Sequence, residues 1–387
     1  MARRVFLHIG PPKTGTSFLQ QAWYQHRSDM AERGLLYPGV AREEQFQACA
    51  VAVGKRTVVD QMRPEGLRAW DRLTRRIEQW EGDALLSSEH YALGRTAAVA
   101  PIMERLHAVA DEVHLLAGAR DLARQIPADW QQTVKQGSVS TFDEFWRNLA
   151  EKERTTFWFH QDLPTLLQRW GGSLPGERVH VVVHGRPGTP HSELWLNMCS
   201  VLGIEPDFLG PVARTNESLD AVQVELIRRM NLAMGEGRSE LATKRAMRSL
   251  IGAGVFADET RRERLTLPAE ATEWLVRRSQ RMVDELRAMD LHVVGDLDDL
   301  LVPAEPPAGR VPDVVSDAET AALAPAVIAR LVETDVARRR ELRDLRDELA
   351  QARRRTALPR PLAEADPVAP RGLAQKVWAR ARGAFAR

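Results

Sequence analysis

The sequence has few cysteines and no long hydrophobic run. Two cysteines among 387 residues, Cys49 and Cys199, allow at most one disulfide, so the chain is not a disulfide scaffold and suits a reducing compartment. No segment approaches the roughly 18 consecutive apolar residues of a membrane span. The first apolar run is interrupted at once by Gly-Pro-Pro-Lys, so we expect no secretory signal and a cytoplasmic protein.

An excess of charge of one sign is also missing. The chain has 54 basic and 53 acidic residues, a formal net charge of +1, which excludes a general electrostatic attraction to nucleic acid. Any phosphate recognition must therefore be local. A hydrophobic fraction of 44% and a charged fraction of 28% are those of a globular protein, so a disordered or fibrous chain is excluded. Only six of the basic residues are lysines, which makes each lysine conspicuous.

Short aliphatic runs alternate with segments of helical periodicity between Val5 and Val294. This alternation indicates βαβ units and predicts an α/β fold, a three-layer parallel sheet flanked by helices. The predicted strands are Val5–Ile9, Leu35–Tyr37, Ala84–Ser87, Val113–Ala117, Val179–Val183 and His292–Val294. The predicted helices are Thr16–Arg27, Leu67–Trp80, Thr96–Ala110, Leu122–Lys135, Leu163–Trp170, Ser192–Leu202, Ala221–Met234, Glu240–Ile251 and Ala269–Met289.

The composition changes after Leu301, where a proline-rich stretch predicts an extended linker. We therefore predict a folded domain over 1–302, a linker over 303–318 and an arginine-rich tail, helical and partly disordered, over 319–387. Leucines at a/d spacing in the 319–354 segment fit either a charged exposed helix or self-association. The last residues, 371–387, carry five basic side chains and no acid, which fits a frayed basic tail or a helix that contacts a membrane peripherally.

The most informative segment is Val5–Gln20, where a buried strand ends at Gly10 and a helix begins at Thr16. Backbone N–H groups and the positive end of the helix dipole then meet at the carboxyl end of the strand, which favours an anion. Gly10 and Gly15 keep the glycine spacing of a nucleoside-triphosphate P-loop, but Thr16 occupies the lysine position and Lys13 lies inside the loop. The sequence therefore predicts a phosphate-binding loop that differs from a nucleoside-triphosphate P-loop in the position of its lysine.

This loop resembles the 5′-phosphosulfate-binding loop of the bacterial sulfotransferase family, with Pro12, Lys13, Thr14, Gly15, Thr16 and Ser17 matching the motif. The resemblance implies a P-loop-like fold and 3′-phosphoadenosine 5′-phosphosulfate (PAPS) as the co-substrate. A plain surface turn is the alternative interpretation. Weaker similarity extends over about residues 4–302, including the segments 157–170, 214–218 and 293–297. Ser218 also fits a helix N-cap.

Arg120 supports the resemblance, because the family has an arginine at the end of the corresponding strand that holds the 3′-phosphate of the donor. The family's serine eight residues later is missing, since position 128 is alanine; Gln131 or Thr133 could replace its hydroxyl. The alternative for Arg120 is a surface salt bridge with Asp121 or Asp129.

The resemblance also implies a base that takes the acceptor proton. The candidates are Glu89 first and His90 second, because they follow a predicted strand at the same sheet edge as the loop. Glu89 could instead cap the next helix or pair with an arginine, and His90 could be a surface histidine. Glu43 and Glu44 are remoter candidates, and His8 is expected in the core. Histidine spacing indicates no metal site.

The resemblance thus implies a metal-independent sulfotransferase that acts on a hydroxyl or amine of a carbohydrate, lipid or small metabolite. The alternatives are a divergent P-loop kinase that uses ATP and magnesium, and an inert nucleotide-binding scaffold.

Overall fold

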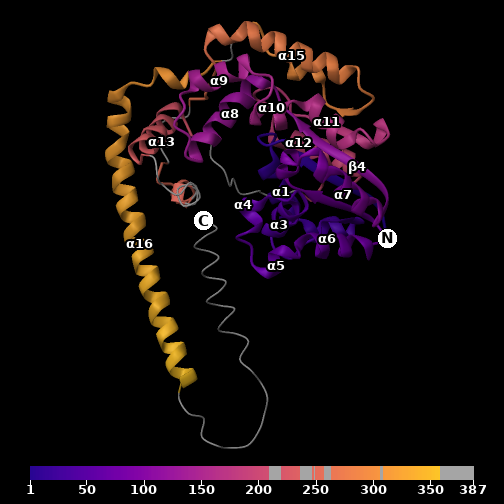
Figure 1. Ribbon diagram of the computed structural model, residues 1–387, viewed down its shortest axis with the longest axis horizontal. Helices are drawn as coiled ribbons and strands as arrows, with labels where there is room; N and C mark the ends of the chain where they lie inside the picture. The colour runs from indigo at the N-terminus through magenta and orange to yellow at the C-terminus, as the bar shows by residue number, and fades with distance from the viewer. Residues whose placement is uncertain (209–218, 236–245, 248, 257–262, 306–307, 358–387) are drawn as a thin grey trace, which may run out of the picture. The chain divides into compact units, whose positions relative to one another are not determined.

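The computed structural model of the chain describes residues 1–208, 219–235, 246–247, 249–256, 263–305 and 308–357 (Figure 1). Its centre is a six-stranded sheet in the order β2-β3-β1-β4-β5-β6, in which every neighbouring pair is parallel. The strands are β1 Ala2–Gly10, β2 Leu35–Leu36, β3 Asp83–Ser87, β4 Ala110–Ala119, β5 Val179–Val183 and β6 His292–Val294.

Helices cover both faces of this sheet. The helices of the first half are α1 Thr16–Gln25, α2 Arg27–Glu32, α3 Glu43–Ala52, α4 Arg56–Val59, α5 Pro64–Leu67, α6 Ala69–Glu78, α7 Thr96–His107 and α8 Leu122–Lys135. Those of the second half are α9 Phe142–Glu151, α10 Thr156–Gln161, α11 Leu163–Gly171, α12 His191–Leu202, α13 Ala221–Ala233, α15 Thr272–Arg287 and α16 Asp317–Ala357. The predicted three-layer α/β fold with a P-loop-like parallel sheet and a helical C-terminal extension is confirmed.

Every predicted strand is present, because the central strands are buried on both faces and their aliphatic runs are unmistakable. Helix boundaries are less well predicted. The helix expected over Thr16–Arg27 ends at Gln25, since His26 leaves the helical region at φ −102° and ψ 20° and a second helix starts at Arg27. The helices α3, α9 and α10 were not predicted, and most of the segment Glu240–Ile251 lies outside the described residues.

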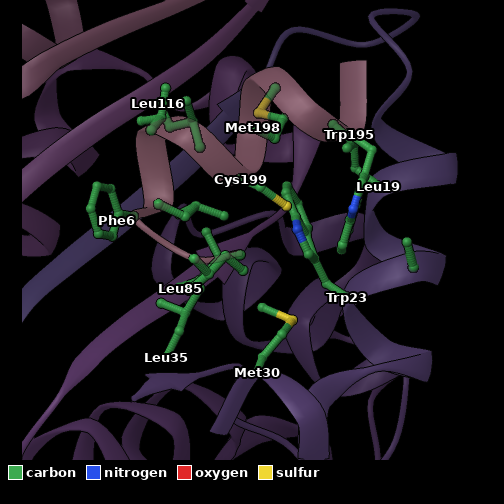
Figure 2. Close-up of a cluster of buried hydrophobic side chains, with 14 of the residues drawn as sticks. Phe6, Leu19, Trp23, Met30, Leu35, Leu85, Leu116, Trp195, Met198 and Cys199 are labelled. Atoms are coloured by element: carbon green, nitrogen blue, oxygen red, sulfur yellow. The ribbon is translucent and has the colours of Figure 1, made fainter. Parts of the chain in front are cut away.

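One face of the sheet packs on α1 and α12. Phe6, Leu85 and Leu116, from β1, β3 and β4, belong to one cluster of buried side chains with Trp23 of α1 and Met198 of α12 (Figure 2). Burying each of these large side chains stabilises the fold by roughly 1.5–3 kcal/mol. The cluster therefore fixes α1, and with it the loop that precedes the helix, against the sheet.

The chain divides into two compact units. Unit 1 consists of Met1–Trp130, Phe142–Glu217 and Leu265–Gly309 and contains the whole sheet. Unit 2 consists of Gln131–Thr141, Ser218–Arg264 and Arg310–Arg387. The domain over 1–302 with a linker over 303–318 stays a prediction, as does the role of the tail beyond 357, which lies outside the described residues.

A row of histidines crosses three strands of unit 1. His180 of β5 hydrogen-bonds His114 of β4 and His292 of β6, with 2.8 Å between the ring nitrogens in each case. Burial, the neighbouring imidazoles and Arg4 lower the pKa of His180 to about 3. In β1, burial lowers the pKa of His8 to about 4, although the Glu89 carboxylate partly offsets it. Both imidazoles are therefore neutral in the folded protein at neutral pH, and His8 lies in the core as expected.

These two histidines predict an acid-sensitive fold. In the unfolded chain they bind protons near pH 6.5, whereas in the folded chain they do so only near pH 3–4, so their contribution to stability is complete above pH 6.5 and is lost as the pH falls. We expect the free energy of unfolding to fall by up to about 1.4 kcal/mol per pH unit for each histidine. Urea denaturation between about pH 4 and 7 measures this slope.

The matched variants are His180→Phe and His107→Asn. The first should flatten the slope by about one proton, and the second, which changes an exposed histidine, should leave the slope as it is. Equal slopes in wild type and His180→Phe would contradict the assignment.

Candidate active site

The loop between β1 and α1 has an unusual backbone. Gly10 and Gly15 have φ values of +88° and +79°, and Lys13 between them has φ +70°, the only positive φ of a non-glycine residue in the described part of the chain. A side chain in this left-handed region costs about 1–2 kcal/mol, and such strain is concentrated at functional sites. The loop also passes close to Glu89, because a Cβ atom at Gly10 would lie 3.0 Å from the Cα of Glu89. The loop therefore holds Lys13 in a conformation that the side chain disfavours.

Three successive carbonyl oxygens of the loop are bound by side chains. The Thr14 hydroxyl donates to the Pro11 carbonyl at 2.7 Å, and Arg120 Nη1 donates to the Lys13 carbonyl at 3.0 Å. The Pro12 carbonyl accepts from the Nε2 atoms of two glutamines, at 2.5 Å from Gln125 and 3.1 Å from Gln161.

These contacts orient the amides of the loop. The C=O and the next N–H of a trans peptide point in opposite directions, so the N–H groups of Lys13 and Thr14 point away from Gln125 and Arg120. Successive amides next to a left-handed residue form a concave site for an anion. Residues of α8 and α10 thus turn the loop into an anion-binding conformation.

Helix α1 adds to the same site. Its N-cap is Gly15 in the left-handed conformation, its first turn has no acidic residue, and no side chain caps it. The positive end of the helix dipole therefore faces the loop, where it favours a negative charge. Thr16 is buried, at the position where a triphosphate P-loop has its lysine. The predicted loop residues Pro12, Lys13, Thr14, Gly15, Thr16 and Ser17 lie together here.

Lys13 is surrounded by charged groups of both signs. Burial lowers the pKa of its ammonium group, the carboxylates of Asp129 and Glu89 offset part of this effect, and Arg120 lowers the pKa further. The side chain is half-buried. The structure thus brings Lys13, Glu89 and Arg120, which were predicted from separate segments of the sequence, into one site at the carboxyl edge of the sheet.

Glu89 begins the turn that follows β3, a short helix η1 over Glu89–Leu93. Gln20 of α1 donates from Nε2 to the Glu89 carboxylate at 2.9 Å and to the Ser87 hydroxyl at 3.3 Å. The hydroxyl of Ser88, and not the carboxylate of Glu89, caps η1 by accepting from the His90 amide. The alternative role of Glu89 as a helix cap is therefore wrong, and its carboxylate is held beside the loop.

His90 has different neighbours. Its Nδ1 lies 3.1 Å from Lys55 Nζ, and its ring packs against Phe46 of α3 with 4.9 Å between the centroids. A lysine ammonium only donates, so Nδ1 is the acceptor in this contact. While the contact is in place, Nδ1 is not available to take a proton from a substrate.

Arg120 follows β4 and donates to the Lys13 carbonyl of the loop. Asp121 pairs with Arg124 and accepts from its amide at 2.9 Å, so it caps α8. The Oδ1 atom of Asp129 lies 3.8 Å from Nε2 of His160. Of the residues proposed to replace the hydroxyl missing at Ala128, Gln131 donates its side-chain amide to the Leu219 carbonyl at 2.8 Å.

Sequence reasoning missed several residues of this site. Gln20 lies on α1, which follows the loop, and Gln125 lies on α8, which follows Arg120. Only their position on the helix face that is turned toward the loop could have indicated that they belong to the site. His184 follows β5, and its ring would lie within 4 Å of a Cβ atom at Gly15. The end of a central parallel strand is the signal that could have found it.

Other predicted candidates have structural roles. Glu44 of α3 is buried, pairs with Arg72 and accepts from the Val40 amide at 2.8 Å. Ser218 lies outside the described residues, and the expectation that it caps the next helix is wrong, because the N-cap of α13 is Asp220. Within the described ranges we find no cluster of three or more potential metal ligands. In the same part of the chain, no helix is both long and apolar enough to cross a membrane.

Comparison with known proteins gives one distant structural similarity. No protein-family model matches the sequence, and no curated protein matches it. A sulfotransferase from Alicyclobacillus acidocaldarius has a similar structure, with 15% sequence identity and a TM-score of 0.35. The match covers 64% of this chain and 96% of the other. A similarity with so low an identity and TM-score gives no evidence for function. The evidence for function is the geometry of the loop and its surroundings.

Proposed function

We propose that this protein transfers a sulfuryl group from PAPS to a hydroxyl or amine of a carbohydrate, lipid or small metabolite. One observation carries the proposal: Lys13 sits in the middle of the anion-binding loop in a strained conformation, while buried Thr16 occupies the lysine position of a triphosphate loop. An ammonium group at mid-loop suits a 5′-phosphate and the bridging oxygen next to it. It does not suit the far end of a triphosphate.

The site residues divide into a leaving-group side and an acceptor side. On the leaving-group side, the Lys13 ammonium group, Thr16 and the loop amides would stabilise the charge that grows on the bridging oxygen as its bond to sulfur breaks. Arg120 is suited to the 3′-phosphate, since its planar guanidinium can bind a phosphate with two parallel N–H groups, and its contact with the Lys13 carbonyl holds it beside the loop.

On the acceptor side, the proton of the attacking hydroxyl or amine would pass to the Glu89 carboxylate as the new bond to sulfur forms. Two contacts support Glu89 over His90 in this role. Glu89 lies against Gly10 of the loop and is oriented by Gln20, whereas His90 accepts from Lys55.

Thermal-shift measurements test the proposal, because a ligand that binds only the folded protein raises its melting temperature. We expect adenosine 3′,5′-bisphosphate to stabilise the protein in the presence of a chelator, and labelled PAPS to sulfate an acceptor under the same conditions. Stabilisation by ATP only with magnesium would instead support a kinase. Binding of the bisphosphate without transfer to any acceptor class would support an inert scaffold.

A further inference from the structure

The long helix α16, Asp317–Ala357, has two parts with different surroundings. Its first part packs on its own unit: Asp317 and Thr320 hydrogen-bond Arg229 of α13 at 2.6 and 3.0 Å, and Val327 is buried. Farther along, Arg338 donates to the hydroxyl of Ser249. Within unit 2, Figure 1 shows α13 beside the half of α16 that comes first in the sequence. The first part of α16 is therefore held by contacts within the chain.

The second part has an apolar seam on its surface. Leu342, Leu345, Leu349 and Ala352 occupy successive a and d positions of a heptad pattern. Leu342 and Leu349 are 54% and 46% exposed, so the described part of the chain does not bury them. Leucines at this spacing on an exposed helix form the contact face of a coiled coil.

The heptad pattern is interrupted just before the seam. In the same register, Asp335 and Arg338 would occupy the preceding a and d positions, and both are polar. Asp335 pairs with Arg339 at 2.6 Å, and Arg338 binds Ser249, so each has a partner inside its own unit. The interruption of the heptad therefore marks the boundary between a part that packs on unit 2 and a part that is built for another contact.

The charges beside the seam select the partner. Glu341 and Glu348 occupy g positions, and Arg339 and Arg346 occupy e positions. In a parallel pair of identical helices, a g residue faces the e residue that follows it by five positions on the other chain, so Glu341 would meet Arg346. In an antiparallel pair, g would face g and the glutamates would repel each other.

We infer that residues 341–352 of α16 form a parallel two-stranded coiled coil with a second copy of this chain. In such a dimer the leucines of one copy pack against the leucines of the other, and Glu341 of each copy faces Arg346 of the other. The segment therefore carries both halves of the contact, which favours a second copy of this chain over a partner with a different sequence. Two heptads bury little apolar area, so the dimer is reversible and depends on protein concentration. This association is independent of the chemistry at the Lys13 loop.

Sedimentation velocity over a range of concentrations tests this inference on the full chain. The mass of the wild type should rise from 43.5 kDa toward twice that value. Leu342→Glu with Leu349→Glu should keep the protein monomeric, and both sites are exposed, so folding is not at risk. Val336→Glu is the matched control, because Val336 is 41% exposed on the same helix but lies at a b position off the seam. A wild type that stays monomeric, or a dimer that persists in the double variant, would overturn the inference.

Charge reversal and cross-linking test the orientation. Glu341→Arg should weaken the dimer at least several-fold, and Glu341→Arg combined with Arg346→Glu should restore it. Ala352→Cys places a thiol at a d position, where a parallel dimer brings the two copies together under oxidising conditions. The native cysteines are buried and do not compete. A dimer without this cross-link and without rescue would be antiparallel or would use another surface, and either result would refute the parallel seam.

Discussion

Replacing Lys13 with alanine should lower the rate of sulfuryl transfer by about 100-fold or more, since removing a single donor to a developing negative charge commonly costs this much. The affinity for adenosine 3′,5′-bisphosphate should fall as well, because the ammonium group is the loop's own cation. The folded state should not be destabilised. The pKa of Lys13 is lowered mainly by burial, so the charged side chain gains little from its position in the absence of an anion.

The same position separates function from stability. Lys13 has φ +70°, which glycine adopts without strain, so Lys13→Gly should be more stable than Lys13→Ala by about 1 kcal/mol although both lose the same ammonium group and should lose activity to the same extent. Chemical denaturation measures the difference in unfolding free energy, and turnover of labelled donor measures the loss of activity. Lys152→Ala, which removes an exposed lysine elsewhere in unit 1, is the matched control and should change neither. Unaltered turnover in Lys13→Ala would remove Lys13 from the mechanism.

The sheet could be predicted from the sequence because its strands carry a strong local signal. β1, β3, β4 and β5 are buried on both faces, so each is a nearly continuous aliphatic run, and the helical periodicity between them is typical of βαβ units. The loop could also be predicted from a local signal, because its residues, Pro12 to Ser17, are contiguous in the sequence. Helix α3 was missed because its buried face contains polar residues, Glu44 and Gln45, whose partners lie elsewhere in the chain. Helix α9 was missed although its buried residues Phe142, Trp146 and Leu149 recur at helical spacing.

The support of the loop could not be predicted. Gln125 and Gln161 are 36 residues apart and both donate to the Pro12 carbonyl, a contact that exists only once α8 and α10 are placed on the sheet. The choice between Glu89 and His90 was open for a related reason. The two residues are adjacent in sequence, and only the turn at η1 directs one toward Gln20 and the other toward Lys55.

Replacing Glu89 with glutamine should lower kcat by about 100- to 10,000-fold, the usual contribution of a positioned general base, while the affinity for adenosine 3′,5′-bisphosphate stays within a few-fold of the wild type. The substitution is isosteric, so Gln20 keeps an acceptor on the side-chain carbonyl oxygen and the loop keeps its contact at Gly10. The bisphosphate binds on the leaving-group side, and the lost group belongs to the acceptor side. This split between rate and nucleotide affinity is what a base predicts and a merely structural carboxylate does not.

His90→Gln is the matched comparison, because it changes the neighbouring residue at the same sheet edge. Its hydrogen-bond partner is Lys55 and its packing partner is Phe46, so its loss should disturb the surface of α3 and leave turnover within a few-fold of the wild type. Rates measured across pH separate the two candidates further. Loss of the acidic limb of the kcat profile in Glu89→Gln, with that limb retained in His90→Gln, identifies the carboxylate as the group that must be ionised. The reverse pattern would make His90 the base and would require its ring to leave Lys55 during the reaction.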